Sequence, residues 1–261
     1  MERVMHPSPV EPTLLRLQSH HRSELLWKEK TPYDLSIRPI KIETAWSLFT
    51  SYPSHHRVEE YLSSAGLYDV VRVGRMQYDR HLLTAMVERW RPKSHCFHLP
   101  FGEAMITLQG VQVLFGLRID GHLIYLADIF GKGRSWRDML EALTGYVGPI
   151  SGRSFVSITN LTDFIKDELE MEPIGDDNPV AKVEKIARLS MLVILGGILL
   201  PNSSDINIRL HFLAFLDLTG SAGSYSWGST ILAYLYRSLY CASYEGARVR
   251  YGYLPLIQLI K

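Results

Sequence analysis

Apolar residues recur three or four positions apart through most of the chain, a spacing that predicts amphipathic helices rather than strands. The windows with this spacing are 58–65, 83–90, 136–143, 159–169, 180–199, 207–218 and 229–242. Gly66, Pro92 and Gly145 supply the stops expected after the first three. Ser54 and Ser135 precede two of the windows and are predicted N-caps. We therefore expect a mainly α fold, a single multi-helix globular domain.

Strand signals are few, and the main candidate for a short β element is 104–108, because its residues suit an extended backbone. An alternative remains open at this place. Thr107 could cap a helix that runs through Val111 to Gly116. Gly110 weakens that helix, since glycine costs about 1 kcal/mol relative to alanine inside one.

Residues 1–40 differ from the rest, because five prolines surround one short apolar-periodic piece, 14–27. We expect an extended N-terminal leader, 1–40, docked on one domain, 41–261. No period of 20–50 residues repeats, which argues against a solenoid.

Composition narrows the class of protein. Apolar residues make up 46% of the chain, and 28 basic residues stand against 27 acidic ones, so no global charge excess draws it to nucleic acid. Two cysteines, Cys96 and Cys241, are too few for a disulfide framework and suit a reducing compartment. The most apolar run, 189–200, reaches about half the ~20 residues of a membrane helix and predicts a buried helix. The opening residues lack an apolar signal core.

Metal chemistry is suggested by His95, Cys96 and His98, with Glu103 close behind. A closed zinc site needs four ligands, and no second pair follows at a conventional spacing. These side chains alternate with Phe97 and Leu99, so polar groups beside a core are the preferred interpretation. We expect no catalytic, cofactor-binding or metal-binding residues and no cofactor, and a metal-dependent enzyme is the minor alternative.

Charged and aromatic clusters offer two further surfaces. The basic cluster that could contact nucleic-acid phosphates comprises Arg72, Arg75, Arg80, Arg89, Arg91 and Lys93. A solvated helix face is the preferred interpretation of it. The acidic stretch 167–177 is expected to be a solvated loop. Tyrosines and Trp227 near the C-terminus are expected to pack in the core rather than to stack on bases.

Several longer stretches carry a family resemblance. They read RWRPKSHCFHLPFGE at 89–103, ITLQGVQVLFGLRIDG at 106–121, LGGILLP at 195–201, YSWGS at 225–229 and AYLYR at 233–237. Together they resemble the plant mobile domain, also labelled aminotransferase-like, and the leader resembles that of MAINTENANCE OF MERISTEMS-like proteins. The chain departs from the pattern at Gly110, usually acidic, and at Lys93 and Cys96, more often Glu and Thr. Relatives usually continue beyond Leu259 into a Trp-rich segment.

The resemblance implies that the motif residues are mainly structural. These are Trp90, Pro92, His95, Phe97, His98, Gly102, Glu103, Gly116, Asp120, Gly121, Tyr225, Trp227, Gly228, Tyr234 and Arg237. It also implies a domain shared with retrotransposons and with host proteins of the plant nucleus. Such relatives act in meristem maintenance, transposon silencing, gene-expression control and genome integrity.

The expected function is therefore a non-enzymatic nuclear protein-interaction module. Its expected partners are nuclear proteins, including phosphatase-like and chromatin factors, with no membrane. Direct DNA or RNA binding through the basic cluster 72–93 is the alternative. The residues do not specify an oligomeric state.

Overall fold

Helices dominate the computed structural model, as the apolar spacing predicts. It describes residues 18–29, 42–124, 135–202, 206–216, 222–244 and 255–258. Two small antiparallel three-stranded sheets accompany the helices within one domain. The mainly α prediction is confirmed.

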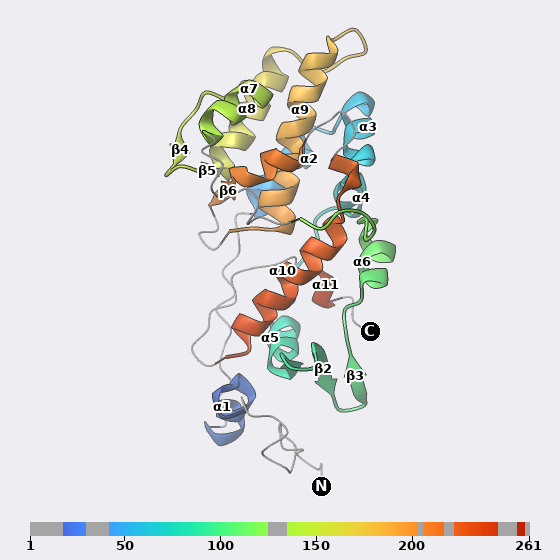
Figure 1. The fold of residues 1–261 in the computed structure, drawn as a ribbon, viewed down its shortest axis with the longest axis vertical. Coiled ribbons are helices and arrows are strands. Elements are labelled where there is room, and N and C mark those ends of the chain that lie inside the picture. Colours follow the sequence, from blue (N-terminus) through green and yellow to red (C-terminus); the bar gives the residue numbers. More distant parts are fainter. Residues whose placement is uncertain are drawn as a thin grey trace.

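One end of the molecule is a helical cluster built around α9 (Figure 1). Its members are α2 (Ile42–Ser51), α3 (His56–Ser64), α7 (Trp136–Thr144), α8 (Ile158–Met171) and α9 (Val180–Val193). Helix α9 contacts α3, α7 and α8, and α2 packs on α8. Most of the second half of α9 is buried, and it continues into the π-helical segment η3 (Ile194–Leu199), which is buried throughout. The apolar run therefore forms a buried helix, as expected.

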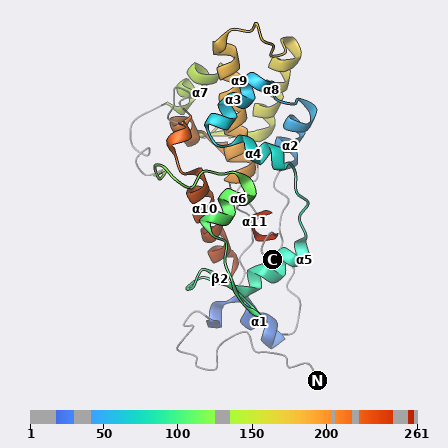
Figure 2. The same cartoon turned by 90° about the vertical axis from the view of Figure 1, so that its right-hand side faces the viewer.

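The long helix α10 (Trp227–Ala242) links this cluster to the other end of the molecule (Figures 1 and 2). Around it lie α4 (Tyr68–Val73), α5 (Arg80–Arg89), α6 (Leu108–Phe115) and α11 (Pro255–Gln258). Helix α10 packs on α6 and on strand β1, and α11 packs on α5. No helix among the described residues has the length and apolarity to cross a membrane.

The two sheets differ from the sequence prediction. One contains β1 (Trp90–Arg91), β2 (Cys96–Leu99) and β3 (Gly102–Ala104) in that order. The other contains β4 (Ile150–Ser151), β5 (Phe155–Ser157) and β6 (Asn207–Arg209). The β element predicted at 104–108 is replaced by β3, which lies earlier in the chain and ends at Ala104. Thr107 instead accepts a hydrogen bond from the Gly110 amide at 3.0 Å and caps α6, so the open alternative is the observed one.

Two helix predictions need correction. The window 207–218 begins as strand β6, because pairing with β5 outweighs its helical spacing. Among the residues described in this window, 207–216, only Leu210–Phe215 coils, as the 3-10 helix η4. The N-cap of α3 is His55, not Ser54, since the His55 ring accepts from the Arg57 amide. Ser135 does cap α7, and its hydroxyl accepts from the Asp138 amide at 3.3 Å.

The leader is described at η1 (Gln18–His20) and α1 (Arg22–Glu29), and the rest of 1–40 lies outside the described residues. Helix α1 contacts α5, and His21, Arg22 and Ser23 are buried. The Arg22 amide donates to the Ser243 carbonyl at 2.9 Å. This part of the leader thus contacts the domain at the end opposite the α9 cluster (Figure 2). The boundary at residue 40 stays a prediction.

The stop after α6 gives a stability prediction. Gly116 has φ +64°, and a Cβ there would lie 2.2 Å from Asp69 Oδ2. Gly116→Ala should lower the free energy of unfolding by about 2 kcal/mol, because left-handed strain and crowding add. Chemical denaturation measures it. Gly152→Ala is the control, since φ is +59° with nothing within 4 Å, and it should cost only about 1 kcal/mol. Equal losses of unfolding free energy in the two variants would show that the Asp69 side chain moves away from a Cβ at position 116 without cost.

Candidate functional site

An apolar pocket opens in the α9 cluster. Its volume is about 520 Å³. Its apolar lining residues are Leu48, Phe49, Pro53, Val58, Ile165, Leu169, Pro173, Ile174 and Ile186. Leu48 and Phe49 of this lining belong to α2, and residues of α8 and α9 form the walls. The 172–178 loop forms the edge. An open apolar pocket with a few polar groups is the usual form of a binding site.

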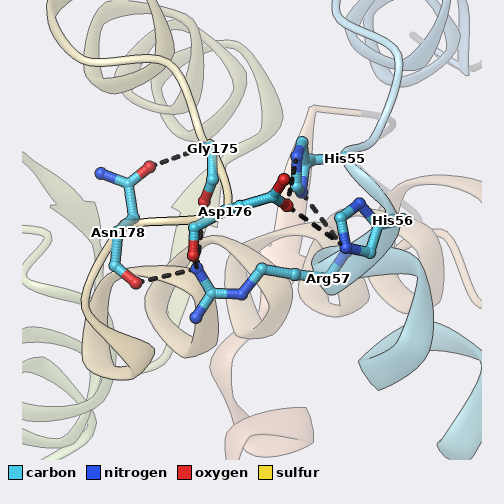
Figure 3. A network of polar contacts seen from close by, with 6 residues as sticks. All are labelled: His55, His56, Arg57, Gly175, Asp176 and Asn178. Atoms are coloured by element: carbon cyan, nitrogen blue, oxygen red, sulfur yellow. Dashed lines mark hydrogen bonds and ion pairs between the residues drawn. The ribbon is translucent and has the colours of Figure 1, made fainter.

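The edge of the pocket is held in place by Arg57 in the first turn of α3 (Figure 3). Its Nη1 donates to three backbone carbonyls of the 172–178 loop, at 3.0 Å to Gly175, 2.9 Å to Asp176 and 2.8 Å to Asn178. Charge-assisted hydrogen bonds of this kind are roughly twice as strong as neutral ones. We call this contact the Arg57 clasp. It joins α3 to a loop about 120 residues away in sequence.

Two histidines beside the clasp face the Asp176 carboxylate (Figure 3). The Nε2 atoms of His55 and His56 lie 3.6 and 3.4 Å from Asp176 Oδ1. These groups stand at the start of α3, where the helix dipole is positive and favours an anionic partner. The arrangement therefore ties the acidic side chain to the helix. His55 also lines the pocket, so the clasp and the pocket share a wall.

The sequence predicted a solvated loop for the acidic stretch 167–177. In the structure this stretch is not a single loop. Its first part belongs to α8, because the apolar spacing continues to Met171. There Glu168 pairs with Lys185 at 2.7 Å, and Glu170 accepts from the hydroxyl of Tyr52, a pocket-lining residue. That hydrogen bond is the largest cause of a raised Tyr52 pKa. Glu170 thus stands beside the pocket through its contact with Tyr52.

The loop is also tied to α9 by Lys182. Its Nζ donates to Glu172 O at 2.6 Å and pairs with Glu172 Oε2 at 2.7 Å. The hydrogen bond from Lys182 holds the pKa of Glu172 below its usual range. Asn178 Nδ2 donates to Glu172 Oε1 at 2.8 Å. Contacts within the chain therefore hold the edge of the pocket in place.

The β2–β3 hairpin brings together most of the residues considered for metal binding. Cys96 Sγ lies 3.4 Å from Glu103 Oε2, and His98 Nε2 lies 3.2 Å from Glu103 Oε1. Burial raises the pKa of the Cys96 thiol and lowers that of His98. His95 is not part of this group, because the turn gives it φ +53° and its ring stacks on Tyr236 at 5.4 Å.

The basic cluster is partly used within the protein. Arg72 pairs with Asp69 at 3.2 Å and Arg75 with Glu43 at 2.6 Å. Arg91 is buried against His21 and Ser23, so the structure removes it from the candidate nucleic-acid surface.

Five cations of the cluster are exposed, and three of them form no ion pair with the described residues: Arg80, Arg89 and Lys93. Arg80 and Arg89 stand nine positions apart on α5, and such positions point to opposite sides of a helix. These residues do not form one continuous stripe.

The aromatic motif residues lie mainly in the core. Trp90, Phe97 and Trp227 are each 0% exposed, which confirms the burial expected of them. Tyr234 is half-buried, and its hydroxyl donates to Pro201 O at 2.5 Å. The Trp227 indole donates to Ala222 O at 3.0 Å.

Several of the remaining motif residues join the segment after α6 to the start of α10. The Gly228 amide donates to Arg118 O at 2.7 Å, and Asp120 pairs with Arg118 at 3.2 Å, which lowers the Asp120 pKa. Gly121 is required by close approach, since a Cβ would lie 2.2 Å from Ser224 O. Pro92 and Tyr225 are half-buried, whereas Gly102 and Arg237 are exposed.

Comparison with known proteins decides the family. The plant mobile domain family matches residues 66–260, about three quarters of the chain. The chain belongs to the plant mobile domain family. This plant mobile domain is 34% identical over 260 residues to the serine/threonine-protein phosphatase 7 long form homolog of Arabidopsis thaliana, covering 98% of this chain and 18% of that protein.

Two further Arabidopsis thaliana relatives are similar. Protein MAIN-LIKE 2 is 26% identical over 99% of this chain and 37% of its own length, and Protein MAINTENANCE OF MERISTEMS is 27% identical over 71% and 37%. This plant mobile domain thus spans less than half the length of these relatives. No solved structure matches it.

Sequence reasoning missed the pocket and the Arg57 clasp. The pocket depends on how α2 packs on α8. A helix was predicted at 159–169, but neither a helix at 42–51 nor the contact between the two was predicted. The clasp donates to backbone carbonyls, which carry no residue signature. A usable signal existed for the hairpin, since residues two apart on a strand share a face.

Proposed function

We propose that this plant mobile domain is a non-enzymatic protein-interaction module of the plant nucleus, and that it binds its partner at the apolar pocket. The observation that carries the proposal is the pocket itself. About 520 Å³ of open apolar space beside a loop fixed by the Arg57 clasp suits an inserted side chain. Burying an aliphatic or aromatic anchor there contributes about 1.5–3 kcal/mol.

The charges around the pocket favour a basic partner segment. Asp167, Glu170 and Asp177 are exposed on the neighbouring turn of α8 and on the loop. Complementary charges raise the rate of association and select the partner. The proposed ligand is therefore a peptide segment with an apolar anchor flanked by lysine or arginine.

The names of the relatives support the biological setting. MAINTENANCE OF MERISTEMS and the phosphatase 7 long form homolog share this domain with the chain. The proposal places it with phosphatase-like and chromatin factors in meristem maintenance, transposon silencing, gene-expression control and genome integrity. It includes no phosphatase chemistry, because the chain covers only 18% of the protein that carries that name.

Direct nucleic-acid binding is the second candidate, supported by the exposed Arg80, Arg89 and Lys93. It predicts steep loss of affinity with salt, because bound cations release counterions from the phosphates. Arg80→Ala, Arg89→Ala and Lys93→Ala combined would then abolish retention.

The pocket gives the discriminating prediction. Leu169→Arg and Ile174→Arg should each reduce partner recovery about tenfold or more, because a charge replaces apolar wall. Recovery is measured by affinity purification of the tagged chain from plant nuclei, with nuclease treatment, followed by quantitative mass spectrometry.

Matched controls place the same charge elsewhere. Val113→Arg on α6 matches Leu169→Arg, and Val147→Arg in a loop matches Ile174→Arg, since both valines are exposed, at 81% and 68%. Both controls should keep the partners. Partners that survive every pocket variant, or that disappear with nuclease alone, would contradict the pocket proposal.

A further inference from the structure

The hairpin carries three chemically different metal-ligand side chains on one face. Cys96 and His98 are two residues apart on β2, so their side chains point to the same side. Glu103 on β3 is the register partner of His98. Phe97, between them, points to the other side and is fully buried in the core. Strand pairing thus places a thiol, an imidazole and a carboxylate together.

The spacing of these groups fits a tetrahedral metal. Zinc bonds of about 2.0–2.3 Å at tetrahedral angles separate neighbouring ligand atoms by roughly 3.3–3.8 Å. Here Cys96 Sγ and Glu103 Oε2 are 3.4 Å apart, and His98 Nε2 and Glu103 Oε1 are 3.2 Å apart. The three ligand atoms all lie within 4.8 Å of one another.

A second three-residue group, His55, His56 and Asp176, has similar spacing but a less suitable setting. It stands at the positive end of α3, which disfavours a cation. Its His55 ring accepts from the Arg57 amide, and a zinc-bound Nε2 would require a proton on that acceptor nitrogen. The hairpin group also includes a thiol, the ligand that most favours zinc over magnesium or calcium.

We propose that the hairpin binds one Zn²⁺ through the Cys96 thiolate, His98 Nε2 and the Glu103 carboxylate. A water molecule completes the tetrahedron, because the described structure brings no fourth strong protein ligand to this face. Three protein ligands with one open position distinguish this site from a closed structural zinc site. The site is independent of the pocket proposal, since α2, α8 and α9 take no part in it.

Charge balance supports the site. Binding replaces the Cys96 thiol proton with zinc and releases that proton to solvent, so no oxidant or reductant is needed. The thiolate and the Glu103 carboxylate then neutralise the two positive charges of the ion. The nearby Arg91 opposes a cation in part, and its guanidinium is directed to His21 and Ser23 in the leader.

The test uses the purified full chain, stripped with chelator under reducing conditions. Zn²⁺ titrated against a chromophoric chelator should bind with one high-affinity equivalent. Co²⁺ in its place should give the visible bands of a tetrahedral site and a thiolate-to-cobalt charge-transfer band. Cys96→Ser should remove the charge-transfer band and weaken Zn²⁺ binding at least about 100-fold, and Glu103→Gln should weaken it about 10- to 100-fold.

The controls separate this site from the other candidates. Cys241→Ser removes the other cysteine, which is exposed, and His56→Ala breaks the α3 group. Both should leave the affinity and the cobalt spectrum unchanged. Circular dichroism of Cys96→Ser shows whether the fold is kept. Absence of the high-affinity equivalent, or its loss in His56→Ala with retention in a folded Cys96→Ser variant, would overturn the proposal.

Discussion

Replacing Trp227 with alanine is expected to lower the free energy of unfolding by about 4 kcal/mol, because tryptophan to alanine in a packed core costs 3–5 kcal/mol. The side chain is 0% exposed and packs edge-on against Phe215 and Tyr225, with ring centroids 6.4 and 6.2 Å away. Its indole N–H donates to Ala222 O, so the replacement also leaves that carbonyl without its side-chain donor. The measurement is urea unfolding followed by circular dichroism.

Phe101→Ala provides the comparison for Trp227→Ala. Phe101 is an aromatic residue of another family stretch, 89–103, but it is 86% exposed in the turn between β2 and β3. Its removal should change the unfolding free energy by less than about 0.5 kcal/mol. Similar losses for the two variants would mean that the start of α10 is not a packed part of the core.

A helix was most clearly predictable where the sequence carries both an apolar stripe at helical spacing and residues that cap or end the helix. Helix α7 is the clearest case, because Ser135 caps it and Gly145 ends it at φ +67°. Helices α8 and α10 began within two residues of their predicted starts. In α7 local hydrogen bonding and amphipathic spacing agree. Helices α8 and α10 follow the spacing alone, since neither N-cap side chain makes a capping hydrogen bond.

The failures occur where distant pairing outweighs local preference. Strand β6 pairs with β5, about fifty residues earlier, and no feature inside 207–218 reports that partner. Trp90 was expected within a helix, yet it leaves α5 because it pairs with Phe97 in β1–β2. A helical period and a strand pairing can coexist in one segment, and burial against the partner selects between them.

The same reasoning explains which parts of the candidate sites were visible. Cys96, His98 and Glu103 were recognised as a group, but the sequence did not show that His95 would leave it. That separation follows from the hairpin turn, where the His95 amide donates to the Arg91 carbonyl at 2.9 Å. The pocket was invisible, because it forms between helices far apart in sequence. Its acidic surroundings were visible only as composition.

We expect the leader contact to depend on pH through His21. Its Nε2 donates to Trp90 O at 2.9 Å, so the neutral ring carries its proton there, and Nδ1 accepts from the Ser23 amide at 3.1 Å. Burial, and then the nearby charge of Arg91, lower the pKa of His21 from 6.5 to about 4. Arg22 acts in the same direction. The ring is therefore neutral when the leader is docked.

Docking should weaken as the pH falls from about 6.5 to about 4. Across this range the released His21 binds a proton and the docked one does not, so acid favours release. The lowering of the pKa from 6.5 to about 4 corresponds to a loss of about 3 kcal/mol in the free energy of docking. This loss is complete only below pH 4. Hydrogen exchange of the amides of α1, followed by mass spectrometry from pH 7 to pH 4 and corrected for intrinsic rates, measures it.

The decisive comparison for the leader is His21→Asn, which keeps a polar side chain but cannot take up a proton in this range. Burial also lowers the pKa values of His98 and His211, so part of any pH dependence belongs to them. The difference between the original chain and His21→Asn isolates the contribution of His21. His20→Asn changes an exposed neighbour and should show the same dependence of α1 amide exchange on pH as the original chain. If His21→Asn also shows that pH dependence, the neutral His21 does not hold the leader, and the contact of Arg22 with Ser243 must do so.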